Sequence, residues 1–413
     1  MILHQSSFYD LPAWGVNCVD HSELKSFAWP LKDAEINRFF LSEKFSVDCF
    51  VEGNIKSENC DSFLVFLSGA VSDRLGKKGP FFSGISLARE LGMAFCSVAD
   101  STLSISEDLT LSWYAGNVAA RKFQKNVAEV INHIAISVGK RPIIVGGSGG
   151  GFAALQIASM LSVRSSLLIW NPQTSIADYS PKFVHAYLSA AFPDIYQAEI
   201  ALDSTLLNIL KKTGINFDVR NLKLPDFVDV IYLQNENDWH VNAHLFPLMD
   251  NFHWENIHRN FYLRKDRKNY AVYIGKWGDG HAPIPKEMLK ILVNKISLGF
   301  SSDDISGFLE KNYPALNEFI YDLSWNSFSL SSIDLDFFVE DDLLKVNAIL
   351  PKNFKNANYA FYLLIDGLRT EISWYKKESF VEFKIPEGCK DVKVTVFIQN
   401  FKKQKWSKTF SIC

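Results

Sequence analysis

The sequence predicts an α/β fold: a mostly parallel, doubly wound sheet with a helical cap insertion, followed by a small C-terminal all-β sandwich. Three observations predict it. Up to residue 300, short apolar runs alternate with helical patterns, a rhythm that is typical of parallel sheets covered on both faces. A helical stretch, residues 179–214, interrupts this rhythm once. From residue 333 onward, strand-like runs follow one another with only turn residues between them.

The individual elements follow from hydrophobic periodicity and from the glycine and proline residues that end each pattern. Strands are expected at residues 45–51, 62–67, 93–98, 143–145, 166–170, 228–233 and 270–274, and later at 359–365, 380–385 and 392–398. Helices are expected at residues 82–91, 117–138 and 286–298, with one more soon after residue 145. Pro12 and Pro30 interrupt the periodicity of residues 1–45, to which we assign no chemistry.

These patterns divide the chain into three parts. Residues 1–300 are expected to form the α/β domain, with residues 179–214 inserted as a lid or cap. Residues 301–326 have the pattern of a helical connector. Residues 327–413 are expected to form a β-sandwich accessory domain.

Composition and charge exclude several classes of function. Of the 413 residues, 47% are hydrophobic and 22% are charged, and the net charge is −3. Nothing therefore favours binding to nucleic acid or to an anionic membrane surface. No apolar run approaches the length of a membrane span, and the N-terminus has no signal-peptide pattern. The six cysteines are scattered without a C-x-x-C pair, so we expect a reducing, cytoplasmic setting. The oligomeric state stays open.

A glycine cluster that contains one serine follows the strand expected at 143–145. Its pattern, Gly146-x-Ser148-x-Gly150, lies between an apolar run and a helical pattern, as on a sharp strand-to-helix turn that presents a serine. Glycines allow the strand and the helix to approach closely there. A phosphate-binding loop is disfavoured, because no Lys-Ser/Thr pair follows and the G-x-G-x-x-G spacing is poor. We interpret Ser148 as a nucleophile.

Two polar segments follow later strands, at the sheet edge where ligands collect. Asp238 and His281 each lie just past the end of a predicted strand. A nucleophilic serine needs a base, and the base needs an orienting carboxylate, so we interpret His281 as the base and Asp238 as the acid. Glu236 and Asp279 are the alternative acids. The other nearby histidines are expected at the surface or in packing contacts: His185, His240 and His244.

Three segments resemble the nucleophile, acid and histidine segments of the α/β-hydrolase fold. They are Gly146-Gly147-Ser148-Gly149-Gly150, Asn235-Glu236-Asn237-Asp238-Trp239-His240-Val241 and Gly280-His281-Ala282-Pro283. Asn235 stands where the family usually has glycine, a change that leaves the acid untouched. The resemblance covers roughly residues 45–300 and implies that Ser148 is the nucleophile, His281 the general acid/base and Asp238 the orienting carboxylate.

The resemblance also implies an oxyanion hole made of two backbone N–H groups. Gly149, directly after the nucleophile, supplies one of them. The second is expected from Ser68-Gly69-Ala70, which stands in place of the family's frequent His-Gly-x, with Ala70 preferred and Gly69 the alternative.

Substrate contacts are expected from two further places. Asn171 and Gln173 follow another predicted strand, where their side chains could hydrogen-bond a substrate. The insertion 179–214 lies where this fold often carries a lid. Its aromatic side chains either line the substrate site or form the buried face of an amphipathic helix.

Taken with the resemblance, these residues imply acyl-ester chemistry through an acyl-enzyme. If water accepts the acyl group, the protein is an esterase or deacylase without metal or cofactor. Its expected substrate is then an O-acylated glycan or a related small ester, by analogy with hydrolases that carry a β-sandwich. If a glycan hydroxyl accepts the group, the protein is an O-acetyltransferase with acetyl-CoA as donor. A non-catalytic binding protein on the same scaffold is the alternative from another class, and a peptidase is a weaker one.

Overall fold

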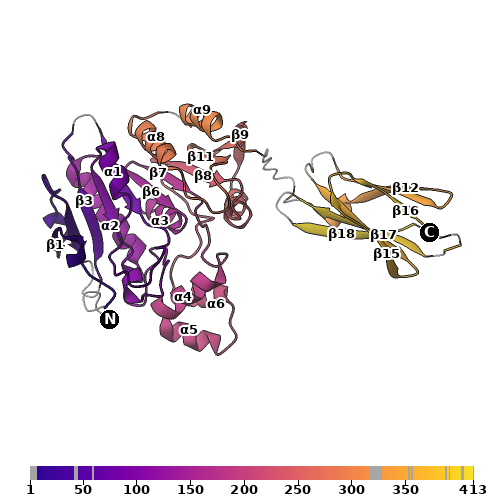
Figure 1. Ribbon diagram of the computed structural model, residues 1–413, viewed down its shortest axis with the longest axis horizontal. Coiled ribbons are helices and arrows are strands. Elements are labelled where there is room, and N and C mark those ends of the chain that lie inside the picture. Colours follow the sequence, from indigo (N-terminus) through magenta and orange to yellow (C-terminus); the bar gives the residue numbers. More distant parts are fainter. Residues whose placement is uncertain are drawn as a thin grey trace. The chain divides into compact units, whose positions relative to one another are not determined.

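The computed structural model describes residues 7–40, 45–57, 60–300, 302–316, 325, 328–351, 354, 357–386, 388, 389, 391–400 and 404–412. The chain divides into two compact units, Met1–Phe319 and Ile320–Cys413 (Figure 1). The boundary lies within residues 301–326, which the sequence analysis assigned to a helical connector. In that range α9 (Ser302–Asn312) packs into the core of the first unit through Ile305 and Leu309.

One large sheet runs through the first unit. Its strands are β1 (Asn17–His21), β2 (Glu35–Phe39), β3 (Val47–Glu52), β4 (Ser62–Leu67), β5 (Phe95–Val98), β6 (Arg141–Gly147), β7 (Ser165–Trp170), β8 (Val228–Asn235), β9 (Trp254–His258), β10 (Phe261–Arg264) and β11 (Arg267–Gly275). Their order in the sheet is β1-β2-β3-β5-β4-β6-β7-β8-β11-β10-β9. The central strands from β5 to β11 are all parallel, whereas β3 and the β9–β10 hairpin pair in antiparallel fashion.

The helices of this unit lie between the strands in sequence. They are α1 (Ile85–Leu91), α2 (Phe123–Val138), α3 (Gly149–Ala158), α4 (Pro181–Ala191), α5 (Pro193–Ile200), α6 (Leu206–Thr213), α7 (Phe246–Met249), α8 (Lys286–Ser297) and α9. Side chains of α1, α8 and α9 share a buried cluster with Ile143 and Val145 of β6. Ile144 is equally buried and points to the opposite face, and α2 packs against α3.

The insertion between β7 and β8 forms three helices. Figure 1 shows α4, α5 and α6 grouped together at one end of the first unit. Among the residues that the structure describes, no helix is both long and apolar enough to cross a membrane.

The second unit consists of two antiparallel sheets. Its strands are β12 (Asp334–Glu340), β13 (Leu343–Ile349), β14 (Asn358–Ile365), β15 (Leu368–Lys376), β16 (Phe380–Lys384), β17 (Val392–Gln399) and β18 (Lys405–Ser411). The sheets have the orders β12-β13-β16 and β15-β14-β17-β18. Val346 from the first sheet and Phe361 and Val396 from the second belong to one hydrophobic core, so the two sheets form a sandwich. The predicted fold class is confirmed in both units.

Close packing at the turn between β6 and α3 makes a glycine necessary there. A Cβ on Gly150 would overlap the carbonyl oxygen of Leu67 at the end of β4, and neither backbone can move without disturbing the sheet. We expect Gly150→Ala to lower the free energy of unfolding by about 1–3 kcal/mol, the usual effect of overpacking.

Chemical denaturation of the full chain measures this effect. Gly307→Ala is the matched control, because Gly307 lies in α9 and a Cβ there would meet no atom within 4 Å. That variant is expected to be stabilised by about 0.5–1 kcal/mol through helix propensity. Equal effects of the two substitutions would contradict the packing explanation.

Candidate active site

Ser148 lies on a strained turn at the carboxyl end of β6. Its backbone has φ 53° and ψ −121°, a region that non-glycine residues rarely adopt and that is found where the surrounding structure enforces it. A Cβ on Gly146 would come within 2.6 Å of the carbonyl oxygen of Gly150, so the strand and the helix can meet only with glycine there. The turn presents Ser148 to a cleft of about 710 Å³, whose walls include His281 and Tyr179.

A continuous chain of hydrogen bonds leads away from the serine. His281 Nε2 lies 3.0 Å from Ser148 Oγ, and His281 Nδ1 lies 2.6 Å from Asp238 Oδ2. Both alternative acids point elsewhere: Glu236 accepts a hydrogen bond from Leu316 N–H (2.9 Å), and Asp279 lies 3.7 Å from Lys276. The structure therefore brings together the three residues that the sequence analysis selected.

The carboxylate of Asp238 is buried and remains ionised. Burial alone would raise its pKa, but hydrogen bonds from His240 and His281 outweigh burial and lower the pKa to about 2. An ionised Asp238 can only accept hydrogen bonds. His281 Nδ1 therefore carries the hydrogen of this contact, and His281 Nε2 is free to accept the hydroxyl hydrogen of Ser148.

The loop that carries His281 is held by two asparagines. Asn235 donates to the carbonyl oxygens of Gly278 (3.0 Å) and Gly280 (2.8 Å). Asn171 donates to the carbonyl oxygen of Ala282 (2.9 Å). Asn235 is the residue that departs from the glycine of the family pattern, and in this chain its side chain connects the acid loop to the histidine loop.

The three residues follow three different strands of one parallel sheet. Ser148 comes after β6, Asp238 after β8 and His281 after β11, so all three lie at the carboxyl edge. A serine on a strand-to-helix turn, followed along the chain by an acid and then a histidine, is the arrangement of one fold. The first unit has the α/β-hydrolase fold. The resemblance noted in the sequence is thus confirmed at the level of the fold.

Several solved structures match this chain at low sequence identity. No family model and no curated protein matches this sequence. Acetyl xylan esterase 1 from Thermoanaerobacterium sp. JW/SL YS485 is 14% identical with a TM-score of 0.41, and the match covers 66% of this chain and 85% of that one. An acylaminoacyl peptidase in complex with a chloromethyl ketone is 14% identical with a TM-score of 0.40, over 72% and 44%.

A third match is the glycosylation-associated Gap123 complex from Streptococcus agalactiae, at 11% identity and a TM-score of 0.37, over 68% of this chain and 47% of that chain. This chain thus spans less than half of the peptidase and of the Gap123 chain. All three TM-scores lie below 0.5, so the hydrolase fold rests on the strand order and on the site geometry described above.

The loop after β4 borders Ser148. Gly69 and Ala70 line the cleft together with Ser148. The N–H groups on either side of them are occupied: Ser68 donates to Tyr114 Oη (2.8 Å) and Val71 donates to the carbonyl oxygen of Thr110 (2.8 Å).

Two N–H groups of that loop stay available to an oxyanion. Those of Gly69 and Ala70 make no hydrogen bond to any residue that the structure describes. Gly149 N–H is the first of α3 and has no acceptor within the helix. The oxyanion donors Gly149 and Ala70 stay a prediction that this geometry permits.

The buried carboxylate of Asp100 holds the loop that contains Ser112, Trp113 and Tyr114. Trp113 and Tyr114 have φ values of 51° and 54°. Asp100 accepts hydrogen bonds from Tyr114 N–H (2.7 Å) and from Ser112 Oγ (2.7 Å). Burial raises the pKa of Asp100 to about 6, although these hydrogen bonds oppose the rise. Tyr114 then holds Ser68, the residue before Gly69 and Ala70.

The two predicted substrate-binding residues are occupied by contacts within the protein. Asn171 is buried, and its side chain donates to Ala282 O and accepts from Asn235 N–H (2.8 Å). Gln173 is fully buried, and its Nε2 lies 2.7 Å from Ser148 Oγ. In this structure Gln173 contacts Ser148 Oγ and does not line the cleft. Binding of substrate by either residue stays a prediction.

His240 is a site residue that the sequence analysis placed among packing histidines. Its Nδ1 lies 2.8 Å from Asp238 Oδ1, and its Nε2 lies 3.3 Å from Gln173 Nε2. Burial lowers the pKa of His240, although Asp238 opposes this effect. The signal available in the sequence was that His240 lies two residues after Asp238. At this spacing the two residues form a short turn, in which His240 N–H donates to Asp238 Oδ1 (3.0 Å).

The donor atoms of Asp238, His240 and His281 all lie within 4.8 Å of one another, which is compact enough to hold a metal ion. Hydrogen bonds alone also explain this closeness, because Asp238 Oδ1 accepts from His240 and Asp238 Oδ2 accepts from His281. That arrangement directs both Nδ1 hydrogens to the carboxylate and fits proton transfer from Ser148.

The aromatic side chains of the insertion have different environments. Tyr179 lines the cleft and stacks on Trp239 with ring centroids 5.6 Å apart. Tyr187 and Phe192 are buried, and Tyr187 packs on Trp113 with centroids 5.6 Å apart. Of these three insertion aromatics, only Tyr179 is placed to meet a substrate.

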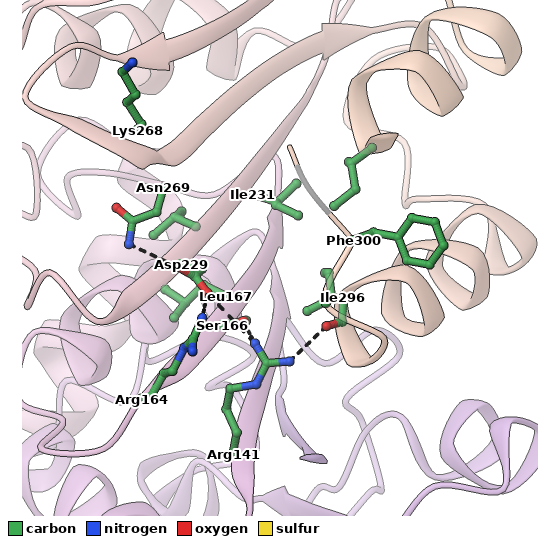
Figure 2. A pocket seen from close by; sticks show the side chains of 13 residues that line it. Arg141, Arg164, Ser166, Leu167, Asp229, Ile231, Lys268, Asn269, Ile296 and Phe300 are labelled. Carbon is green, nitrogen blue, oxygen red and sulfur yellow. Dashed lines mark hydrogen bonds and ion pairs between the residues drawn. The ribbon is translucent and has the colours of Figure 1, made fainter. Parts of the chain in front are cut away.

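A second cavity, of about 370 Å³, lies at the amino ends of β6, β7, β8 and β11 (Figure 2). Ser148 follows the other, carboxyl end of β6. Arg141 donates to Ser166 Oγ (2.8 Å) and to the carbonyl oxygen of Ile296 (2.9 Å). Asp229 lies 3.9 Å from Arg141 and accepts from Asn269 (3.1 Å). These groups bind one another and connect the starts of the strands, so we assign this cavity a structural role.

Proposed function

We propose that this chain is a serine enzyme that acts on acyl esters. In this proposal Ser148 is the nucleophile, His281 the general acid and base, and Asp238 the carboxylate that orients His281. The observation that carries it is the unbroken chain from Ser148 Oγ through His281 to Asp238, with contacts of 3.0 and 2.6 Å, on a serine whose φ of 53° marks an enforced turn. The three groups match a nucleophile, its base and its orienting acid.

The reaction would proceed in two steps. First, His281 Nε2 takes the hydroxyl proton while Ser148 Oγ bonds to the ester carbonyl carbon. The carbon–alkoxy bond then breaks, and the alcohol leaves with the proton from His281. Second, a water molecule gives a proton to His281 and adds to the acyl carbon, after which the Oγ–carbon bond breaks, His281 returns the proton to Oγ, and the acid is released. Gly149 N–H and Ala70 N–H would donate to the carbonyl oxygen when it carries negative charge.

Covalent labelling tests the proposal directly. A fluorophosphonate should attach to Ser148 in the folded chain, and the chain should hydrolyse p-nitrophenyl acetate. Mass spectrometry of the labelled peptide locates the adduct. A folded chain whose Ser148 stays unlabelled would instead support the binding-protein alternative. If CoA is released from acetyl-CoA only when a glycan is present, the acyl acceptor is a sugar hydroxyl and not water.

A glycan-linked ester is the substrate class that the second unit supports. Phe397 lies between the core residues Val396 and Ile398, so it faces the outer side of its sheet. Its ring centroid lies 4.5 Å from that of Tyr362, which also contacts Trp374 at 6.4 Å. Such a group of aromatic rings offers flat apolar surface of the kind on which sugar rings stack.

Trp374 is the most exposed member of this group, with 68% of its surface accessible. We expect Trp374→Ala to lower kcat/KM on an acetylated polysaccharide, with acetylated xylan as the probe, by about 3- to 10-fold through loss of one stacking contact. Turnover of p-nitrophenyl acetate should stay unchanged. Leu368→Ala, on the same strand and 72% exposed, is the matched control. An equal loss on both substrates would argue against a glycan-binding face.

A further inference from the structure

Five side chains close a ring of hydrogen bonds at the reaction centre: Ser148, His281, Asp238, His240 and Gln173. One half is the chain already described, from Ser148 through His281 to Asp238 Oδ2. In the other half, His240 Nδ1 lies 2.8 Å from Asp238 Oδ1. Gln173 Nε2 completes the ring, 3.3 Å from His240 Nε2 and 2.7 Å from Ser148 Oγ. The nucleophile is thus contacted by His281 and by Gln173.

The orientation of the Gln173 amide is fixed by two neighbours, one of which donates a hydrogen bond while the other accepts one. Trp113 Nε1–H can only donate, and it lies 3.2 Å from Gln173 Oε1. Ionised Asp238 can only accept, so His240 Nδ1 carries a hydrogen and the neutral ring offers a lone pair at Nε2. The amide therefore turns its oxygen to Trp113 and its NH₂ group to His240 and Ser148.

We propose that Gln173 is a catalytic residue whose amide donates a hydrogen bond to Ser148 Oγ, and that His240 and Trp113 are positioning residues that hold this amide. The inference rests on the proposed function, because it concerns the same nucleophile. Gln173 occupies an acceptor position of Oγ. The hydroxyl hydrogen of Ser148 is thereby directed to His281 Nε2, the atom that receives it in the reaction.

The donor acts whenever negative charge develops on Ser148 Oγ. In acylation, the O–H bond breaks, the proton passes to His281 Nε2, and Oγ bonds to the acyl carbon. In deacylation, the Oγ–carbon bond breaks, and Oγ keeps the electron pair until His281 returns the proton. A hydrogen bond from Gln173 stabilises this charge in both steps. Hydrogen bonds to charged groups are worth about 10- to 100-fold in an equilibrium or rate.

The position of Gln173 determines which kinetic constant it affects. The side chain is fully buried behind the serine, and the cleft in front of Ser148 is lined by other residues, among them Gly69, Tyr179 and His281. Loss of the amide therefore changes the contacts of Ser148 Oγ and removes no side chain that lines the cleft. We expect the effect in kcat, with KM little changed.

The test compares full-length variants in two assays. One is the rate at which a fluorophosphonate labels Ser148, and the other is kcat and KM for p-nitrophenyl acetate. Gln173→Met keeps the length of the side chain and removes the donor, so both rates should fall about 10- to 100-fold. His240→Asn keeps an N–H donor for Asp238 but removes the acceptor for Gln173, so the fall should be smaller, about 3- to 10-fold.

His244→Phe is the matched control for loss of a buried histidine. The His244 ring centroid lies 4.7 Å from that of His240, but His244 Nδ1 accepts from Thr174 N–H (3.2 Å) and belongs to no part of the ring. This variant should keep kcat within about twofold of wild type, even if its unfolding temperature falls.

The outcomes separate this inference from the proposed function. If wild-type Ser148 is labelled and Gln173→Met keeps the wild-type labelling rate and kcat, the inference is overturned and the proposed function stands. If wild-type Ser148 is not labelled, both are overturned. If Gln173→Met does not fold, His240→Asn decides, because a wild-type kcat in that variant would remove the basis for a held amide.

Discussion

Ser148→Ala is expected to lower kcat by about 10⁶-fold, the loss typical of a serine triad without its nucleophile. In the proposed mechanism Oγ is the atom that bonds to the acyl carbon. Among the described residues no other hydroxyl is hydrogen-bonded to His281 Nε2. Alanine keeps the Cβ and hence the backbone requirements of the turn. The unfolding temperature should therefore stay close to that of the wild type, as measured by circular dichroism.

His281→Ala should produce a loss of similar size, because nucleophile and base act as one unit. For the same reason the double variant should be no slower than either single variant. His281 is about one third exposed, so its loss should leave the sheet intact. Steady-state hydrolysis of p-nitrophenyl acetate measures all three variants. Wild-type rates in either single variant would disprove the assigned roles.

Asp238→Asn is expected to lower kcat by about 10⁴-fold. The introduced amide would offer one oxygen and one NH₂ group to two histidines that both need an acceptor at Nδ1. One histidine must then change its tautomer. If it is His281, Nε2 carries a hydrogen and can no longer accept the proton of Ser148.

The same substitution should change how stability depends on pH. The pKa of Asp238 is about 2 in the folded chain and about 3.9 in an unfolded one. The folded state therefore binds this proton less readily, so Asp238 stabilises the fold above about pH 4 and loses this contribution as the pH falls toward 2.

The burial of His240 adds to acid sensitivity at a higher pH. Its pKa is lowered in the folded chain, so its contribution to stability is complete above about pH 6.5 and decreases as the pH falls below that value. The difference in unfolding temperature between wild type and Asp238→Asn should be present from pH 7 down to about pH 4 and shrink as the pH falls below about 4. A difference that stays constant from pH 7 to pH 3 would contradict this account.

Local patterns were sufficient to predict the central sheet and the positions of Ser148, Asp238 and His281 at its edge. The run Ser62–Leu67 is apolar at almost every position and forms β4 with those bounds, since a strand buried on both faces needs no alternation. Ser148, Asp238 and His281 each follow such a strand. Because these strands are parallel, their carboxyl ends lie at one edge of the sheet, and the three residues lie there too.

Edge strands and long-range contacts were not predictable in this way. Asn17–His21 forms β1 but is mostly exposed, so its hydrophobic pattern is weak. Gln173 and His240 lie 67 residues apart, and only the pairing of β7 with β8 brings their loops together. The side-chain hydrogen bonds of Asn235 to Gly278 and Gly280 likewise depend on how strands far apart in the sequence pair with each other.

The loop that carries His281 links the completion of folding to the appearance of the proposed activity. His281 lies 133 residues after Ser148, and the asparagines that hold its loop follow β7 and end β8, strands that lie between these residues in sequence. A chain that has collapsed but has not yet added β11 to the sheet has a serine without a base. Contacts of such long sequence separation form late and slowly. Recovery of the proposed activity during refolding therefore reports when β11 joins the sheet.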